Sequence, residues 1–183
     1  VYTSTGGDDT INAGDIGFQF GGDAGNDLIS GGDGSDVIDG GNGNDTVYGG
    51  SNDDVLSGGA GSDEISGEVG NDFLAGGSGS DTLNGGTGQD TFSGTAGELN
   101  GDFIEDVANG DVIEVVGEQF GAGDVTVQPA GDTSTVMIDT NGDGNADVSF
   151  TITGNPAATV QQIGGNTYLN FGQSDGLNIT GTP

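Results

Sequence analysis

The sequence contains no lysine, arginine, histidine or cysteine among its 183 residues. Because basic side chains neutralise phosphates, their absence argues against binding to nucleic acids or to anionic membranes. The chain also lacks the usual general base, the thiol and amine nucleophiles, and the nitrogen and sulfur ligands of zinc. No run approaches the ~20 apolar residues of a membrane-spanning helix. Most enzyme classes and membrane insertion are therefore excluded.

Acidic residues and glycine dominate what is present. The chain has 24 Asp, 6 Glu and 42 Gly, which gives a formal charge of −30. Carboxylates, backbone carbonyls, hydroxyls and amides are the hard oxygen ligands that Ca²⁺ prefers. An intrinsically disordered acidic chain would have a similar composition. Disorder predicts no periodicity in the few apolar residues, so a search for repeats discriminates between the two interpretations.

A nine-residue period runs through residues 4–93, which divide into ten consecutive units without an insertion. Residues 31–39, GGDGSDVID, and 76–84, GGSGSDTLN, show the pattern. The fourth position is Gly in eight units and Asn52 in one. The eighth position is always large and apolar: Ile11, Phe20, Ile29, Ile38, Val47, Leu56, Ile65, Leu74, Leu83 and Phe92. The sixth position is Asp in all units but the second, where it is Phe18: Asp9, Asp27, Asp36, Asp45, Asp54, Asp63, Asp72, Asp81 and Asp90. A disordered chain has no reason to keep this register.

The repeat resembles GGxGxDxUx of the RTX (repeats-in-toxin) family, and the match covers about half of the chain. The resemblance implies an all-β fold, a right-handed parallel β-roll in which six residues turn and three form a strand. Two nonapeptides complete one coil, so the ten units predict about five coils. A three-residue strand points its central residue inward, so the eighth-position residues should form two facing apolar ladders. Such a core is thin, and glycine is costly to order, so burial alone is insufficient.

Turns on the same side of the roll are 18 residues apart, which places the sixth-position aspartates in pairs. Seven pairs are doubly acidic: Asp9 with Asp27, Asp27 with Asp45, Asp36 with Asp54, Asp45 with Asp63, Asp54 with Asp72, Asp63 with Asp81, and Asp72 with Asp90. Two carboxylates ~5 Å apart repel by roughly 1 to 3 kcal/mol, and a bound cation reverses the sign.

The family pattern implies Ca²⁺ between two turns, with glycine carbonyls completing its ligands. The expected carbonyl ligands occupy the first, second and fourth positions: Gly31, Gly32, Gly34, Gly40, Gly41, Gly43, Gly58, Gly59, Gly61, Gly76, Gly77 and Gly79. Phe18 cannot be a ligand, so the second unit is expected to be a metal-free edge or a partial cap. Asp23 and Glu68 replace the second glycine of their units, which puts the carbonyl geometry there in doubt.

The period is expected to stop after Ser93, which divides the chain into a roll, residues 1–93, and a β-rich C-terminal capping or assembly domain, residues 94–183. Residues 93–99 are interpreted as a transition. Residues 102–116 alternate around a turn at Asn109 and Gly110, which predicts two short strands, and they resemble the closing segment that follows many RTX repeats. Further alternating runs predict strands at residues 125–128, 135–138, 148–153, 167–171 and 177–180.

A separate calcium candidate lies between two of these predicted strands. Residues 139–147, DTNGDGNAD, place Asp139, Asn141, Asp143 and Asp147 at the first, third, fifth and ninth positions of an EF-hand-type loop. The twelfth position is Phe150 instead of Glu, and the flanks are strands, so a helix–loop–helix EF-hand is rejected. The alternatives are a calcium loop and an ordinary acidic hairpin.

The outward seventh positions differ between the two faces. One face reads Gln19, Val37, Val55, Phe73 and Thr91, and the other reads Leu28, Thr46, Glu64 and Thr82. Exposed apolar stripes usually mark an interface. Either the second half of the chain folds back on the Val37, Val55 and Phe73 stripe, or the stripe mediates self-association into an oligomer or fibre.

The sequence thus predicts a non-enzymatic, secreted or cell-surface bacterial RTX protein that folds on binding several Ca²⁺ ions. Its expected role is structural, in a surface layer, fibre, adhesin or matrix. The family's usual route outward is type I secretion, which the resemblance implies. The alternative is a non-catalytic C-terminal module of a secreted metallopeptidase, lipase or epimerase.

Overall fold

The computed structural model describes residues 2–3, 6–14, 17–108, 110–120, 123–153 and 158–171. These residues form strands and turns without a helix, so they offer no candidate for a membrane-spanning helix. The strands are β1 (Tyr2–Thr3), β2 (Thr10–Asn12), β3 (Gln19–Gly21), β4 (Leu28–Asp33), β5 (Val37–Asn42), β6 (Thr46–Ser51), β7 (Val55–Ala60), β8 (Glu64–Val69), β9 (Phe73–Ser78), β10 (Thr82–Asn84), β11 (Thr91–Gly94), β12 (Phe103–Glu105), β13 (Val112–Val115), β14 (Val125–Ala130), β15 (Thr133–Ile138), β16 (Val148–Thr153), β17 (Ala158–Ile163) and β18 (Asn166–Phe171).

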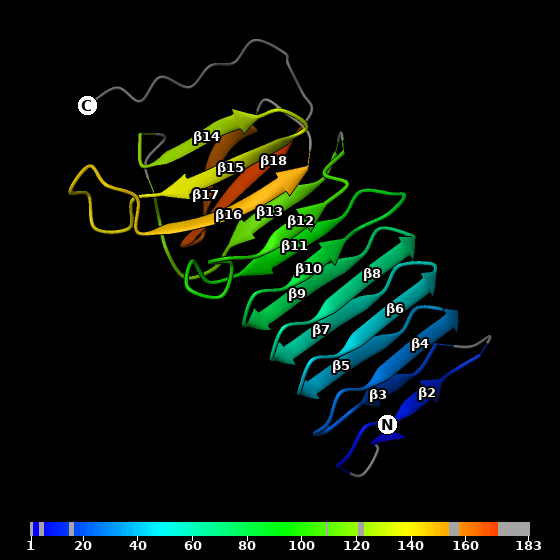
Figure 1. Cartoon of the computed structure of the whole chain (residues 1–183). Coiled ribbons are helices and arrows are strands. Elements are labelled where there is room, and N and C mark those ends of the chain that lie inside the picture. Colours follow the sequence, from blue (N-terminus) through cyan, green and yellow to red (C-terminus); the bar gives the residue numbers. More distant parts are fainter. Residues whose placement is uncertain are drawn as a thin grey trace.

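From β1 to β13, successive strands alternate between two sheets. One nine-stranded sheet has the order β1-β3-β5-β7-β9-β11-β13-β18-β17, and the other has the order β14-β15-β16-β12-β10-β8-β6-β4-β2. Because neighbours from β1 to β13 are parallel and two strands make one coil, the chain winds into a parallel β-solenoid of about six turns (Figure 1). The predicted all-β solenoid is confirmed, with one coil more than expected.

The core lies between the two sheets and consists mainly of eighth-position side chains. Ile29, Val47, Leu56, Leu74 and Leu83 are fully buried. Their Cα atoms are in register, so that Ile29 pairs with Val47 across β4 and β6, and Leu56 with Leu74 across β7 and β9. The two facing apolar ladders predicted from the period are therefore present.

The strands of the middle coils are longer than the three residues expected. Strands β4 to β9 each span six residues, because the ladder also includes the second- and third-position residues of the next unit. Gly32 pairs with Gly50, and Asp33 with Ser51. Glycine has no side chain that could alternate between apolar and polar, so the glycine-rich second half of each strand cannot be predicted from a pattern of alternating residues.

The expectation that the period stops at Ser93 is wrong. After a three-residue insertion at positions 94–96, two further units follow, GELNGDFIE at 97–105 and DVANGDVIE at 106–114. Their strands β12 and β13 pair in parallel with β10 and β11, with Ile104 opposite Leu83 and Ile113 opposite Phe92. The two predicted strands therefore belong to opposite sheets of the solenoid.

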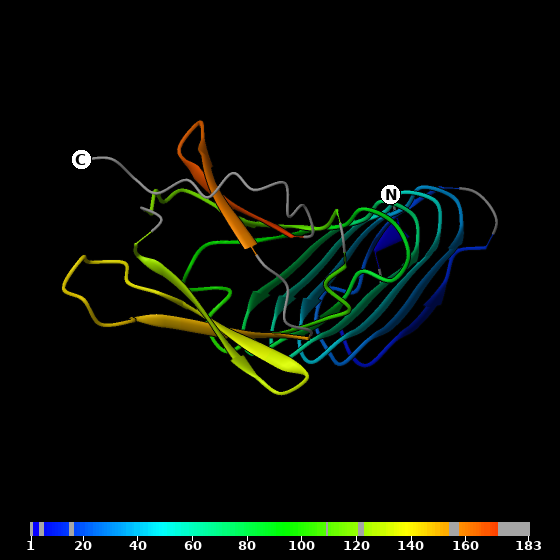
Figure 2. The ribbon, with the colours of Figure 1, turned by 90° about the horizontal axis from the view of Figure 1, so that it is seen from above.

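Beyond β13 the sheets continue with antiparallel strands. β16 joins β12 in parallel and carries the β15 and β14 meander, while β18 and β17 extend the other sheet from β13. Figure 2 shows the two sheets separating at this end. The runs predicted at 125–128, 135–138, 148–153 and 167–171 are strands, β17 was not anticipated, and 177–180 lies outside the described residues. The division into two domains stays a prediction, since the same sheets run through both parts.

Candidate metal sites in the turns

The sixth-position aspartates lie where the turns enter the strands, and they are buried. From Asp27 to Asp90 all eight are only 1–3% exposed. Charged carboxylates are rarely buried to this degree without a partner. The chain has no lysine, arginine or histidine to serve as that partner.

From Asp27 to Asp90, Oδ1 of each repeat carboxylate accepts a hydrogen bond from the preceding coil. The backbone N–H of Asp27 donates to Oδ1 of Asp45 at 2.8 Å, and that of Asp45 donates to Oδ1 of Asp63 at 2.8 Å. The same bond joins residues 18 apart along both edges of the roll, from Asp9 to Asp27 and from Asp72 to Asp90. The predicted stacking of these aspartates is therefore present.

The other oxygen has no partner. Buried Oδ2 atoms without a hydrogen bond occur in all nine repeat aspartates: Asp9, Asp27, Asp36, Asp45, Asp54, Asp63, Asp72, Asp81 and Asp90. An unsatisfied buried charge is strongly unfavourable. Nine equivalent oxygens, one in each unit with Asp at its sixth position, indicate a common counter-charge that comes from solution.

A backbone carbonyl lies beside this oxygen. A Cβ built on Gly40 would lie 2.6 Å from Oδ2 of Asp45 and 2.6 Å from the carbonyl oxygen of Gly58. Gly58 begins the turn that contains Asp63, so the space belongs to the Asp45–Asp63 pair. The same arrangement recurs at Gly22, Gly31, Gly49, Gly58 and Gly67. Six of the seven expected pairs therefore have this oxygen-lined space, and the first residue of the Asp9–Asp27 turn lies outside the described residues.

The donor set fits Ca²⁺. Nowhere in the described ranges do three or more acidic side chains gather at a potential metal site. A cation between two turns would therefore combine carboxylates from two coils with first-position carbonyls, which suits a hard cation with oxygen ligands. Glycine at the first position is necessary because any Cβ would occupy the space.

The second- and fourth-position glycines perform a different task. A Cβ on Gly41, Gly59 or Gly77 would collide with the carbonyl oxygen of the second-position residue one coil earlier. At the fourth position, Gly43, Gly61 and Gly79 approach the preceding coil in the same way. These glycines let the turns stack closely, while their role as ligands stays a prediction.

Burial raises the pKa of these carboxylates. The pKa values of Asp54, Asp63 and Asp72 rise from 3.8 to about 6, chiefly because of desolvation and partly because of neighbouring aspartates. The backbone N–H bond from the preceding coil opposes the rise. Without a cation these groups bind protons more readily than ordinary aspartates.

A second ladder of hydrogen bonds joins the turns, with its acceptors on the earlier coil of each pair instead of the later one. The fifth-position side chain accepts a hydrogen bond from the backbone N–H of the following coil, as from Asn44 to Asn26 at 2.7 Å and from Asn71 to Asp53 at 2.8 Å. The sixth-position aspartate accepts from the preceding coil instead. Each turn is thereby bonded to both of its neighbours.

The irregular units keep a positive φ where they replace a glycine. Asn52 replaces the fourth-position glycine with φ of 78°, and Asp23 and Glu68 replace the second-position glycine with φ of 66° and 70°. Asp23 and Glu68 thus keep a positive φ at the cost of strain, while the carbonyl geometry toward a cation stays a prediction at both positions. Phe18 is 40% exposed and its N–H donates to Oδ1 of Asp36, so this unit places no carboxylate at the sixth position.

Sequence reasoning missed two members of the aspartate ladder. Asp102 accepts from the N–H of Asp81 at 2.9 Å, and Asp111 accepts from that of Asp90 at 3.0 Å, both across 21 residues. Both are buried. The nine-residue spacing of the two GDxI segments could have revealed them, had an insertion of three residues been allowed.

The four residues of the predicted EF-hand-type loop come together in the exposed connection between β15 and β16. Asp139 accepts from the N–H groups of Gly142 and Gly144, both at 2.7 Å, and the Gly144 bond is the main cause of its lowered pKa. Asp147 accepts from Thr140, while Asn141 and Asp143 bond within the loop. The loop is thus satisfied by its own donors, and its role as a metal site stays a prediction.

The apolar stripe of Val37, Val55 and Phe73 is exposed, on the sheet that contains β5, β7 and β9. Val37, Val55 and Phe73 are in register on β5, β7 and β9, with 42%, 46% and 37% of their surface accessible. The C-terminal strands add to the end of the sheets and do not cover this face (Figures 1 and 2). The expectation that the second half folds back on the stripe is therefore wrong for the described residues.

A family comparison identifies the repeats that form these turns. The family model described as RTX calcium-binding nonapeptide repeat (4 copies) matches residues 21–56, 48–83 and 67–98. Among solved structures, a similar one is a subunit of the mannuronan C5-epimerase of Azotobacter vinelandii, at 23% identity and a TM-score of 0.39, over 76% of this chain and 71% of that one. No curated protein matches. Residues 21–98 are therefore calcium-binding nonapeptide repeats of the RTX family.

Proposed function

We propose that the chain is an extracellular bacterial structural protein, part of a surface layer, fibre, adhesin or matrix, that folds when it binds several Ca²⁺ ions. The observation that carries this proposal is the row of nine buried, unpartnered Oδ2 atoms. RTX repeats are structural modules, and the chain itself is proposed to be non-catalytic.

Repulsion controls the folding transition. With a formal charge of −30 and no basic side chain, the unliganded chain resists stacking its aspartates. Where calcium is scarce, as in the cytoplasm, it stays unfolded, which suits passage through a secretion channel. Millimolar calcium outside binds only the stacked turns and stabilises them by mass action. Calcium also takes the place of disulfides, which a chain without cysteine cannot form.

Circular dichroism with and without EDTA tests this mechanism. The β-sheet signal is expected to be lost in EDTA and to return on calcium titration, whereas Mg²⁺ at equal concentration restores much less because it demands near-octahedral geometry. A full β-sheet signal in EDTA at neutral pH contradicts calcium-coupled folding.

The exposed stripe of Val37, Val55 and Phe73 supports self-association as part of this structural role. Its next row on the sheet is Asp39, Ser57 and Ala75, so the surface over β7 and β9 bears no charge in these two rows. Two copies of a polyanion approach most easily at such a surface.

Paired variants on the two sheets test the association. Val55→Asp with Phe73→Asp should lower the mass measured by light scattering in calcium. Thr46→Asp with Thr82→Asp adds the same charge at the seventh position of the opposite sheet and should not lower it. An unchanged monomer for the wild-type chain removes the assembly proposal.

A further inference from the structure

The aspartate ladder continues past the ten units of residues 4–93. Asp102 and Asp111 hold the sixth position of the two units that follow the insertion, nine residues apart. Strands β12 and β13 directly after them keep the register of β10 and β11. The coil formed by residues 97–114 thus presents one aspartate at each edge of the solenoid.

These aspartates contact the last repeat aspartates as the repeat aspartates contact one another. The N–H of Asp81 donates to Oδ1 of Asp102 at 2.9 Å, and the N–H of Asp90 donates to Oδ1 of Asp111 at 3.0 Å. Within the repeats the equivalent bond between Asp72 and Asp90 measures 2.9 Å. The three-residue insertion is therefore absorbed in the turn without breaking the ladder.

The oxygens that face this coil lack a partner. Oδ2 of Asp81 and Oδ2 of Asp90 are buried and accept no hydrogen bond. Asp81, Asp90 and Asp111 are 1% exposed and Asp102 is 2% exposed, so water does not screen these carboxylates. Each pair thus joins two buried carboxylates in a chain that has no side-chain cation.

We propose that Asp81 with Asp102, and Asp90 with Asp111, form two additional Ca²⁺ sites that join the repeats to the segment after them. The proposal rests on the proposed function, because it assumes that the repeats bind Ca²⁺. It extends the cation row beyond the nonapeptide motif, from seven aspartate pairs to nine.

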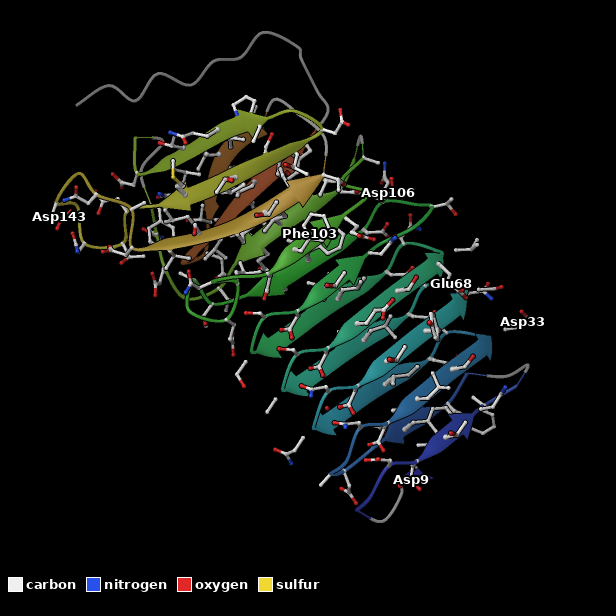
Figure 3. All side chains as sticks on the ribbon, viewed as in Figure 1. Asp9, Asp33, Glu68, Phe103, Asp106 and Asp143 are labelled. Carbon is white, nitrogen blue, oxygen red and sulfur yellow. The ribbon has the colours of Figure 1, made fainter. Side chains whose placement is uncertain are left out.

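The two additional sites differ from those of the repeats. For a Cβ on Gly76 or Gly85, the three nearest atoms all belong to Asp81 or Asp90, and the carbonyl from the next coil is no longer among them. At one edge, Asp106 occupies the first position with φ of 55°, in the column of turns that also contains Asp33 and Glu68 (Figure 3). Oδ2 of Asp111 already accepts from the N–H of Ala108 at 2.6 Å. With fewer free oxygens, these sites fill last in a calcium titration.

Counting bound calcium tests the proposal. The double variant Asp102→Asn with Asp111→Asn keeps the oxygen that accepts from Asp81 and Asp90 but removes both charges. In saturating calcium it should bind two fewer ions per chain, measured by mass spectrometry of the intact complex. The control, Glu64→Gln with Asp132→Asn, removes two exposed acidic groups outside the pairs and should bind as many ions as the wild type.

The outcomes separate this proposal from the proposed function. A wild-type chain that binds no calcium contradicts the proposed function itself. A double variant that binds as many ions as the wild type overturns only the two additional sites. If the variant does not fold, wild-type crystals grown in calcium decide: an ion at about 2.3–2.6 Å from oxygens of both Asp90 and Asp111 supports the proposal. A proton or water in its place refutes it.

Discussion

The N–H of Asp45 donates to Oδ1 of Asp63 at 2.8 Å, while Oδ2 of Asp63 receives no hydrogen bond. One carboxylate thus has two separate tasks. Its first oxygen accepts the bond that connects adjacent coils, and its second oxygen is available to an ion. The two tasks can be separated by substitution.

Asp63→Asn and Asp63→Ala should differ in a defined way. Asn keeps the acceptor for Asp45 but loses the charge, so the calcium midpoint of folding should rise. Ala also leaves the N–H of Asp45 without an acceptor, which should lower the free energy of unfolding by a further amount of about 1–3 kcal/mol. Calcium titrations followed by circular dichroism, with urea denaturation in saturating calcium, measure both effects. Glu64→Gln, an exposed neighbour, is the control, and equal behaviour of the Asn and Ala variants would contradict the division of tasks.

Gly40→Ala should remove a calcium site although it alters no ligand side chain. The added Cβ would lie 2.6 Å from both Oδ2 of Asp45 and the carbonyl oxygen of Gly58, closer than real contacts allow. We expect one fewer ion per chain and a higher calcium midpoint. Gly123→Ala, where nothing lies within 4 Å of the new Cβ, provides the matched control. Full calcium binding by the Gly40 variant would show that the cation sits elsewhere.

Glu68→Gly should stabilise the calcium-bound roll. Glu68 has φ of 70° at a position where most units have glycine, and this left-handed conformation costs a non-glycine residue about 1 kcal/mol or more. Relief of that strain should appear as a higher midpoint in urea denaturation. Glu68→Ala removes the same charge but retains the strain, so a similar gain in both variants would assign the effect to charge.

The metal-free roll should be more stable in acid. The pKa values of Asp54, Asp63 and Asp72 are about 6 in the folded chain, against 3.8 ordinarily. Since the folded state binds protons more tightly, the stability from these groups is fully present below about pH 4 and is lost as the pH rises through about 6. In EDTA the β-sheet signal should therefore be stronger at about pH 4 than at about pH 7. A signal that is constant, or that increases with pH, contradicts this coupling.

The period of nine was sufficient to predict the sheets, the apolar ladders and the stacking of the aspartates, although not their burial. Each depends on residues such as Leu56 and Asp63, whose chemistry repeats in phase. The positions of Asp102 and Asp111 were not predicted, because three inserted residues shift the phase while the hydrogen bond to the preceding coil is kept.

Other features left little trace in the sequence. The fifth-position ladder is built from Asp, Asn, Ser and Gln, which resemble ordinary turn residues, although Asn26 and Asn71 accept bonds from the following coil. Strand β17 was not predicted, because Gln161 and Gln162 interrupt the alternation of apolar and polar residues. The exposure of Val55 depends on where the C-terminal strands pack, which no local pattern encodes.

Because successive units belong to opposite sheets, it matters whether an odd or an even number of units is inserted or deleted. Deletion of a single nonapeptide, such as residues 40–48, would transfer Val55 and Phe73 to the sheet that carries Leu28, while Val37 stayed where it is. Deletion of 40–57 would instead leave Val37 and Phe73 on one sheet, in adjacent coils. A chain of this kind can therefore change length by 18 residues without exchanging its surfaces. A change of nine residues instead moves every later repeat strand to the opposite sheet.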